Sequence, residues 1–163
     1  IPSSIDLAAA ELELGDVPER SMKLRQALAS IRDNYDYILI DCPPAMGLVT
    51  LNAFAACDSV LIPIQCEYYA LEGLSQLMAT IEVEGILLTM YDKRLRLTEQ
   101  VEEEVKKHFP DKLYKTVIPR NVRLSEAPSF GMPVMYFDKL SKGSRAYMDL
   151  AKEFLKKNRV KKG

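Results

Sequence analysis

The chain has 163 residues, of which 48% are apolar and 28% are charged, and this balance is typical of a globular domain. A formal net charge of −1 argues against a uniformly polyanion-binding protein, and no apolar run approaches the length of a membrane span. The three cysteines lack metal-ligand spacing and there is one histidine, so a Cys/His metal cluster is excluded. No signal peptide is visible, and we expect a cytoplasmic protein.

The first part of the chain predicts two helices followed by a buried strand. Helical spacing and end signals predict helices over residues 5–14 and 19–31. The unbroken apolar run over residues 37–40 is typical of a strand buried on both faces of a parallel sheet. Asp41 and two prolines end it. Ligands of such sheets bind beyond the carboxyl ends of the strands, so Asp41 either meets a ligand or metal ion there or caps the next turn.

The middle of the chain continues the alternation of helices and strands. The expected elements are a short helix over residues 51–56, a strand over 59–64, a helix over 69–81 and a strand over 85–90. Gln65 and Glu67 follow the first of these strands. We therefore expect them at the same edge of the sheet as Asp41.

The last part predicts two amphipathic helices around one more strand. Thr98 is expected to cap a helix that buries Val101, Val105 and Phe109. A strand over residues 114–118 follows, ended by Pro119. Ser144 is expected to open the last helix. The predicted buried stripe of that helix consists of Tyr147, Leu150, Ala151, Phe154 and Leu155.

Residues 139–163 carry nine basic and two acidic side chains. Such an end either faces nucleic acid or a membrane, or is a solvated helix end. Strands that alternate with helices predict an α/β fold with a parallel sheet. The sequence contains no G-x-x-x-x-G-K-[ST] loop, no G-x-G-x-x-G motif and no credible nucleophile–histidine arrangement.

Six stretches in a fixed order resemble the ParA/Soj family of chromosome- and plasmid-partitioning ATPases, within the deviant-Walker group that includes MinD. They begin at Ile1 (Ile-Pro-Ser-Ser-Ile-Asp-Leu-Ala-Ala-Ala-Glu), Tyr35 (Tyr-Asp-Tyr-Ile-Leu-Ile-Asp-Cys-Pro-Pro), Leu51 (Leu-Asn-Ala-Phe), Asp58 (Asp-Ser-Val-Leu-Ile-Pro-Ile-Gln-Cys-Glu-Tyr-Tyr-Ala-Leu-Glu-Gly-Leu), Leu87 (Leu-Leu-Thr-Met-Tyr-Asp) and Thr116 (Thr-Val-Ile-Pro-Arg-Asn-Val-Arg-Leu-Ser-Glu-Ala-Pro-Ser-Phe-Gly). The resemblance implies a P-loop NTPase-like fold whose amino-terminal strands are missing. It also implies that residues 1–163 form a single domain, the carboxyl-terminal two-thirds or so of such an ATPase.

The resemblance also implies a site for ATP and Mg²⁺ in the complete protein. Asp41 matches the Walker B carboxylate, which holds Mg²⁺ through its water shell and supports hydrolysis. The residues implied to contact the nucleotide are Pro43, Gln65 and Glu67 near the γ-phosphate switch, and Thr89, Met90, Pro119, Arg120 and Asn121 around the adenine. From the residues alone, the alternative is that Pro43 and Pro119 simply end strands and that Met90 simply fills the core.

Family members bind DNA without sequence preference as ATP-bound dimers, and a ParB-like protein activates them. The resemblance therefore implies a homodimer associated with the nucleoid, with Arg123 as the leading DNA contact. Weaker candidates are Arg94, Arg96, Lys106, Lys107 and Lys115. No membrane binding is expected, because the basic carboxyl end offers only Val160 as a bulky apolar anchor.

The chain departs from the family pattern in two places. Family members begin with a strand and a P-loop that carries two lysines, which would precede Ile1, so we expect this chain alone to bind ATP poorly and to be inactive. Residues 82–84 are also a shorter connection than the family has, which suggests that a segment is missing there. The alternative to a ParA-type ATPase is a non-enzymatic fragment or scaffold that pairs with another chain.

Overall fold

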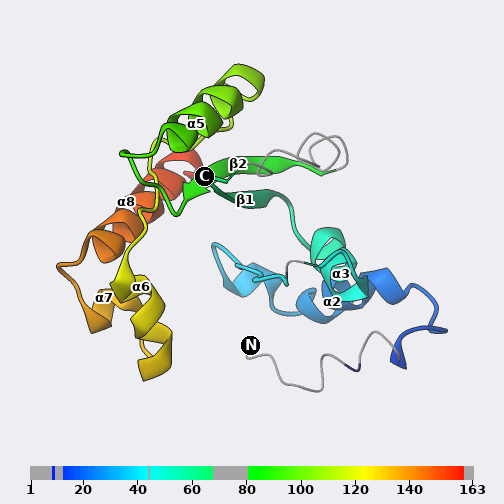
Figure 1. Ribbon diagram of the computed structural model, residues 1–163. Coiled ribbons are helices and arrows are strands. Elements are labelled where there is room, and N and C mark those ends of the chain that lie inside the picture. The colour runs from blue at the N-terminus through cyan, green and yellow to red at the C-terminus, as the bar shows by residue number, and fades with distance from the viewer. Residues whose placement is uncertain (1–8, 10–12, 44, 68–80, 160–163) are drawn as a thin grey trace. The chain divides into compact units, whose positions relative to one another are not determined.

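The computed structural model describes residues 9, 13–43, 45–67 and 81–159 (Figure 1). Backbone contacts divide the chain into two compact units, residues 1–58 and residues 59–163. The single domain expected from the sequence stays a prediction. Of the predicted helices, that over residues 69–81 lies outside the described residues except for its last residue, and that over 5–14 lies largely outside them.

Two short helices, α2 and α3, hold the first unit together. The 3-10 turn η2 (Arg20–Met22) leads into α2 (Lys23–Leu28), and α3 (Leu48–Ala56) packs against them. The buried amide of Asn52 joins these elements. Its Oδ1 accepts a hydrogen bond from the N–H of Leu24 at 3.1 Å, and its Nδ2 donates to the carbonyl of Arg20 at 2.8 Å.

These helices differ in length from the prediction. The expected helix over residues 51–56 is confirmed as α3, which begins earlier. The expected helix over residues 19–31 is broken up, since α2 ends at Leu28 and a separate 3-10 turn, η3 (Arg32–Asn34), follows.

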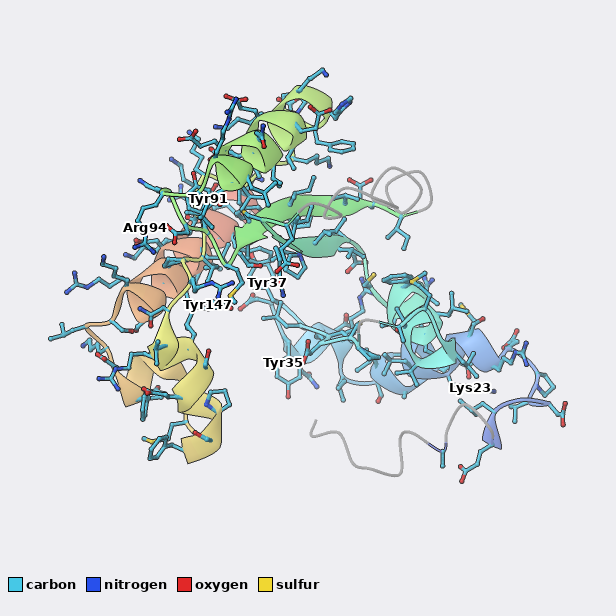
Figure 2. The ribbon with its side chains drawn as sticks, in the orientation of Figure 1. Lys23, Tyr35, Tyr37, Tyr91, Arg94 and Tyr147 are labelled. Carbon is cyan, nitrogen blue, oxygen red and sulfur yellow. The ribbon has the colours of Figure 1, made fainter. Side chains whose placement is uncertain are left out.

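The predicted strand over residues 37–40 is wrong. These residues belong to no strand, and nearby apolar side chains face solvent: Leu39 is 86% exposed, and Tyr35, drawn in Figure 2, is 61% exposed. A strand is stabilised by hydrogen bonds to a neighbouring strand. The described part of the first unit contains no strand that could supply them.

Two parallel strands form the sheet of the second unit. They are β1 (Val60–Gln65) and β2 (Val83–Thr89), paired from Val60 opposite Val83 to Gln65 opposite Thr89. Both predicted strands are therefore confirmed within a residue or two. Gly85 in β2 leaves room for the ring of Tyr114, because a Cβ at this position would lie 2.3 Å from the Tyr114 Cε2.

The predicted strand over residues 114–118 is an extended segment beside β2 and not a continuous strand. The N–H groups of Tyr114 and Ile118 donate to the carbonyls of Ile86 and Leu88, at 2.9 and 2.8 Å. Between these two bonds the ladder is interrupted. Each oxygen of the Glu153 carboxylate accepts one backbone N–H at 2.8 Å, from Lys115 and from Thr116. A side chain thus replaces the neighbouring strand at these two residues.

A helix covers each face of this sheet. Helix α5 (Arg96–His108) buries Val101 and Val105 against Ile64, Ile86 and Leu88. Helix α8 (Lys142–Lys157) buries Leu150 against Leu87, Tyr114 and Ile118. Neighbouring residues of β2 point to opposite faces, which gives the helix–sheet–helix layers of an α/β fold.

Both helices of these layers begin differently from the prediction. Helix α5 begins at Arg96, so Thr98 lies inside its first turn, where its buried hydroxyl has no hydrogen-bond partner among the described residues. Helix α8 is capped by Ser141, whose Oγ accepts the N–H of Ser144 at 3.1 Å. Ser144 is therefore the capped residue and not the cap.

The buried stripe of α8 is narrower than predicted. Leu150 and Phe154 pack on the sheet, whereas Tyr147 and Leu155 are 45% and 51% exposed. Between the extended segment and α8, the chain forms three short helices: α6 (Val122–Glu126), η4 (Ala127–Phe130) and α7 (Val134–Phe137).

Candidate functional site

The carboxyl end of β2 lies beside the end of the extended segment. The N–H of Tyr91 donates to the carbonyl of Ile118 at 3.0 Å, and the N–H of Arg120 donates to the carbonyl of Tyr91 at 3.3 Å. The predicted adenine-side residues Thr89, Met90, Pro119 and Arg120 therefore come together at one edge of the sheet. Asn121 follows and caps α6, because its Oδ1 accepts the N–H of Arg123 at 3.0 Å.

Met90 has a strained backbone at this edge. Its φ is +52°, in the left-handed region, and its side chain is 39% exposed. A residue other than glycine in this conformation costs about 1–2 kcal/mol. This conformation lets the chain turn away from β1 and pair with the extended segment. Just before the turn, the Thr89 Oγ1 donates to the carbonyl of Ile64 in β1 at 3.2 Å.

Gln65 and Glu67 lie at the carboxyl end of β1, as predicted. Gln65 is paired with Thr89, and the N–H of Glu67 donates to the carbonyl of Gln65 at 2.8 Å, which closes a tight turn. Both residues are exposed, whereas Cys66 between them is buried. Gln65 and Glu67 are therefore accessible from solvent at this end of the strand.

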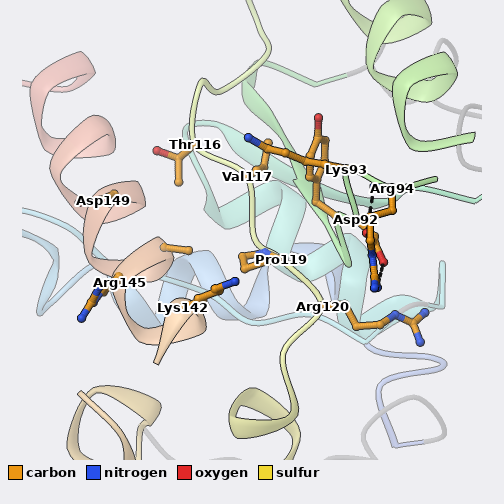
Figure 3. A pocket seen from close by; sticks show the side chains of 12 residues that line it. Asp92, Lys93, Arg94, Thr116, Val117, Pro119, Arg120, Lys142, Arg145 and Asp149 are labelled. Atoms are coloured by element: carbon orange, nitrogen blue, oxygen red, sulfur yellow. Dashed lines mark hydrogen bonds and ion pairs between the residues drawn. The ribbon is translucent and has the colours of Figure 1, made fainter. Parts of the chain in front are cut away.

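A pocket of about 870 Å³ opens beside the loop after β2 and the end of the extended segment. Its walls come from three places: the loop after β2, the extended segment and the first turns of α8 (Figure 3). The lining residues are Tyr91, Asp92, Lys93, Arg94, Thr116, Val117, Pro119, Arg120, Lys142, Arg145, Ala146 and Asp149.

Most of the charge in this pocket is positive. Arg94 is neutralised, since its Nε and Nη2 donate to the two carboxylate oxygens of Asp92 at 2.9 and 2.7 Å. These bonds lower the pKa of Asp92 to about 2. The other cations form no ion pair with any described residue; they are Lys93, Arg120, Lys142 and Arg145. We call these four residues the basic rim.

Tyr91 fastens the loop after β2 to α5. Its hydroxyl donates to Glu102 at 2.5 Å, and this bond raises the pKa of Tyr91 to about 12. Glu102 also accepts a hydrogen bond from Lys106 at 2.5 Å. The loop that carries Tyr91 and Arg94 is labelled in Figure 2.

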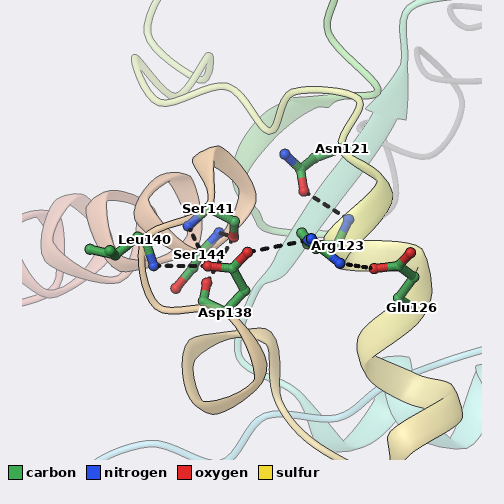
Figure 4. A network of polar contacts seen from close by, with 7 residues as sticks. All are labelled: Asn121, Arg123, Glu126, Asp138, Leu140, Ser141 and Ser144. Carbon is green, nitrogen blue, oxygen red and sulfur yellow. Dashed lines mark hydrogen bonds and ion pairs between the residues drawn. The ribbon is translucent and has the colours of Figure 1, made fainter.

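The predicted DNA contacts have different surroundings. Lys106 and Lys107 are paired with Glu102 and Glu104 on their own helix, at 2.5 and 3.7 Å. Arg123 faces two carboxylates (Figure 4), with its Nη1 2.7 Å from Glu126 and its Nε 3.3 Å from Asp138. Arg96 and Lys115 are exposed and form no ion pair with the described residues.

Asp41 and Pro43 belong to the first unit, so their relation to the residues above stays a prediction. Both are exposed. No group of three or more His, Cys, Asp or Glu side chains that could hold a metal ion occurs among the described residues. A single Asp41 that acts through the water shell of Mg²⁺ is compatible with this arrangement.

Sequence reasoning did not single out Lys93, Lys142 and Arg145, which line the pocket. The signal for the last two was the excess of basic side chains in residues 139–163. This excess does not identify a binding site, because the same excess is common at a solvated helix end. No helix in the described part of the chain is long and apolar enough to cross a membrane.

Comparison with solved structures identifies the class of protein. Cobyrinic acid a,c-diamide synthase from Mycobacterium smegmatis, with a bound ATP analog and magnesium, superposes with a TM-score of 0.75 at 31% identity, over 93% of this chain and 60% of that chain. The cell division ATPase MinD from Pyrococcus furiosus superposes with a TM-score of 0.68 at 26% identity, over 83% of this chain and 58% of that chain. The fold is thus the α/β, P-loop NTPase-like fold, with a parallel sheet and flanking helices.

Comparison with known sequences identifies the family. The AAA domain family matches residues 1–85. The sporulation initiation inhibitor protein Soj of Bacillus subtilis is 57% identical over 94% of this chain, and the chromosome partitioning protein ParA of Caulobacter vibrioides is 51% identical over 98% of it. The chain belongs to the ParA/Soj family of chromosome-partitioning ATPases.

The chain spans about two thirds of these relatives, 65% of the Soj protein and 64% of the ParA protein. The alignment with ParA runs over 172 positions although this chain has 163 residues. Some positions of the relative therefore have no counterpart within the aligned part of this chain. That is compatible with the short connection noted at residues 82–84.

Proposed function

We propose that the complete protein to which this chain belongs is a nucleotide-switched partitioning ATPase that binds DNA without sequence preference, and that the basic rim contacts the DNA. The observation that supports this is a set of four cations around one pocket that form no ion pair with any described residue. Cations that are not paired with carboxylates release counterions from DNA when they bind phosphates, and this release drives affinity.

The chemistry of the rim favours contacts to the DNA backbone over contacts to bases. Lysine and arginine side chains at a pocket mouth reach phosphate oxygens, which are the same for every sequence. Four phosphate contacts predict that the logarithm of the binding constant falls with the logarithm of the salt concentration with a slope of about −3.6. The family membership supports this proposal, since relatives are named as chromosome partitioning proteins.

The nucleotide part of the proposal concerns ATP and Mg²⁺. The backbones of Thr89, Met90, Pro119, Arg120 and Asn121 would surround the base, because the structure brings them together at one edge of the sheet, while the side chain of Arg120 would stay with the basic rim. Pro43, Gln65 and Glu67 would respond to the γ-phosphate, and Asp41 would hold the water shell of Mg²⁺. The solved structure from Mycobacterium smegmatis contains an ATP analog and magnesium, which supports ATP and Mg²⁺ as the ligands.

We further propose a homodimer as the DNA-binding form, a ParB-like protein as activator, and a cytoplasmic, nucleoid-associated location. The alternative is a non-enzymatic scaffold that pairs with another chain. Measuring ATP binding to this chain, and to a version that carries the family's amino-terminal P-loop part, separates the two. Binding that appears only in the longer version supports the ATPase. Lack of binding in both favours the scaffold.

A pair of double variants tests the role of the basic rim in the complete protein with ATP and Mg²⁺. Lys142→Gln with Arg145→Gln removes two rim charges, and we expect at least a tenfold loss of affinity for a random-sequence DNA duplex at low salt, together with a salt slope smaller by about 1.8. The matched control is Lys106→Gln with Lys107→Gln, which removes two cations that are paired on α5. An equal loss in both double variants would contradict the assignment of the rim.

A further inference from the structure

The extended segment beside β2 bulges away from the strand. The N–H of Tyr114 donates to the carbonyl of Ile86, and the next bond of this kind runs from the N–H of Ile118 to the carbonyl of Leu88. The segment thus advances from residue 114 to 118 while β2 advances only from 86 to 88. Extra residues on one side of a strand pair form a bulge, which bends the chain and re-aims the residues that follow it.

This bulge decides which residues reach the carboxyl end of β2. After it, the N–H of Arg120 donates to the carbonyl of Tyr91 at 3.3 Å, so Pro119 and Arg120 lie at that edge. Without the bulge, the N–H of Thr116 would pair with Leu88 in place of that of Ile118. The residues proposed to contact the base would then lie beyond the edge of the sheet.

Glu153 holds the backbone of the bulge. Its Oε1 accepts the N–H of Lys115 and its Oε2 accepts the N–H of Thr116, each at 2.8 Å. Neither N–H donates to a backbone carbonyl within the described part of the chain. Hydrogen bonds to a carboxylate are roughly twice as strong as bonds between neutral groups. A single side chain therefore satisfies both donors that the bulge takes out of the ladder.

Helix α8 makes Glu153 a fixed anchor for the segment. Its neighbours Leu150 and Phe154 pack on the sheet, which holds this turn of the helix against the segment. Figure 3 shows Thr116 and Asp149 on the two walls of the pocket that the segment and α8 form. The bulge and the helix that holds it therefore border the candidate site.

We propose that Glu153 is a positioning residue for the base side of the nucleotide site: it holds the bulge, and the bulge places Pro119 and Arg120 at the end of β2. Glu153 acts through the segment and does not itself contact the base. This inference rests on the proposed function, which puts the base beside these backbones.

Binding of ATP and of GTP, each with Mg²⁺, to the complete protein tests this role, because the two nucleotides differ only in their bases. Glu153→Gln replaces one acceptor oxygen by an NH₂ group, so only one of the two backbone N–H groups keeps its partner. We expect the affinity for ATP to fall about fivefold more than that for GTP, the order of one hydrogen bond to the base. Glu153→Asp keeps the charge but is shorter, and it should show the same change.

The matched control is Val105→Ala. Val105 is fully buried on α5, on the other face of the sheet, so its truncation destabilises the same unit without touching the bulge. Any loss of affinity in this variant should be equal for ATP and GTP.

Hydrogen exchange without nucleotide, followed by NMR, gives an independent readout. In Glu153→Gln the amides of Ile118 and Arg120 should exchange about tenfold faster relative to that of Ile86, because the bulge is free to slip. In Val105→Ala the three amides should keep their relative rates.

The outcomes separate the inference from the proposed function. Equal losses for ATP and GTP in Glu153→Gln, wild-type behaviour of Glu153→Asp, or unchanged relative exchange of Arg120 would each overturn the positioning role and leave the proposed function standing. A complete wild-type protein that binds neither nucleotide, or that binds ATP and GTP equally, would overturn the proposed nucleotide site itself.

Discussion

Replacing Gly85 by alanine should strongly destabilise the second unit. The new Cβ would lie 2.3 and 2.7 Å from two ring carbons of Tyr114 and 2.9 Å from the carbonyl oxygen of Lys112. The Tyr114 ring cannot swing aside freely. It is 1% exposed, its hydroxyl donates to Glu84 at 2.9 Å, and the Lys157 Nζ lies 4.0 Å from its centroid.

The cost follows from these contacts. Overpacking of a filled core costs about 1–3 kcal/mol. A hydrogen bond to a charged partner, such as that from Tyr114 to Glu84, contributes roughly 1.5–3 kcal/mol, and displacement of the ring would lose part of it. We therefore expect a loss of about 2–5 kcal/mol in the free energy of unfolding, a large share of the 5–15 kcal/mol or so that is typical of a folded protein.

Urea unfolding followed by circular dichroism measures this loss. The matched control is Gly143→Ala, where the new Cβ meets only the flexible side chain of Leu124, at 2.6 Å, and the expected loss is smaller. A free energy of unfolding for Gly85→Ala within about 0.5 kcal/mol of the wild type would refute the reasoning. Such a small change is typical of an exposed position and not of one where the new Cβ collides with the Tyr114 ring.

Three further predictions concern the site. Glu153→Gln should lower the free energy of unfolding by about 1–3 kcal/mol at pH 7, because the carboxylate accepts the N–H groups of Lys115 and Thr116. Burial opposes the charge of Glu153, yet these hydrogen bonds lower its pKa. The loss in the free energy of unfolding should therefore be complete above the unfolded-state pKa and should vanish as the pH falls through the folded-state pKa. Urea titrations that show the same loss down to low pH would contradict this. Met90→Gly should raise the urea midpoint by relieving about 1 kcal/mol of left-handed strain while weakening ATP binding, and an unchanged midpoint would argue against strain. Asp41→Ala in the complete protein should abolish ATP hydrolysis and leave the circular dichroism spectrum unchanged, and wild-type turnover with Mg²⁺ would rule that role out.

The layers of the second unit could be predicted from the sequence because each element shows its own pattern. Val101 and Val105 mark the buried face of α5 at helical spacing, and charged residues mark the other face. The apolar runs of β1 and β2 are typical of strands covered on both sides. Local sequence is sufficient where one element packs on a continuous surface.

Other features depend on partners far away in the sequence. The apolar run over residues 37–40 looks like a strand, but a strand needs a neighbour, and none lies in the described part of its unit. The interruption at Lys115 and Thr116 depends on Glu153, which comes from α8. The local sequence cannot reveal that a carboxylate from α8 takes the place of a neighbouring strand as hydrogen-bond acceptor.

The same holds for the candidate site. The four cations of the basic rim are scattered between residues 93 and 145, and only the fold gathers them around one pocket. Arg123 reads as a free cation in the sequence, whereas the structure gives it Glu126 and Asp138 as partners. Resemblance to a family could point to this arginine, but the number of its ion pairs is a property of the structure.

The salt dependence of DNA binding tests the central claim most directly. With the complete protein, ATP and Mg²⁺, the affinity for two unrelated DNA duplexes is measured over a series of potassium chloride concentrations. Four phosphate contacts by the basic rim predict equal affinities for the two duplexes and a log–log slope of about −3.6. A slope near zero, or a strong preference for one duplex, would contradict a surface that binds the DNA backbone through the four cations of the basic rim.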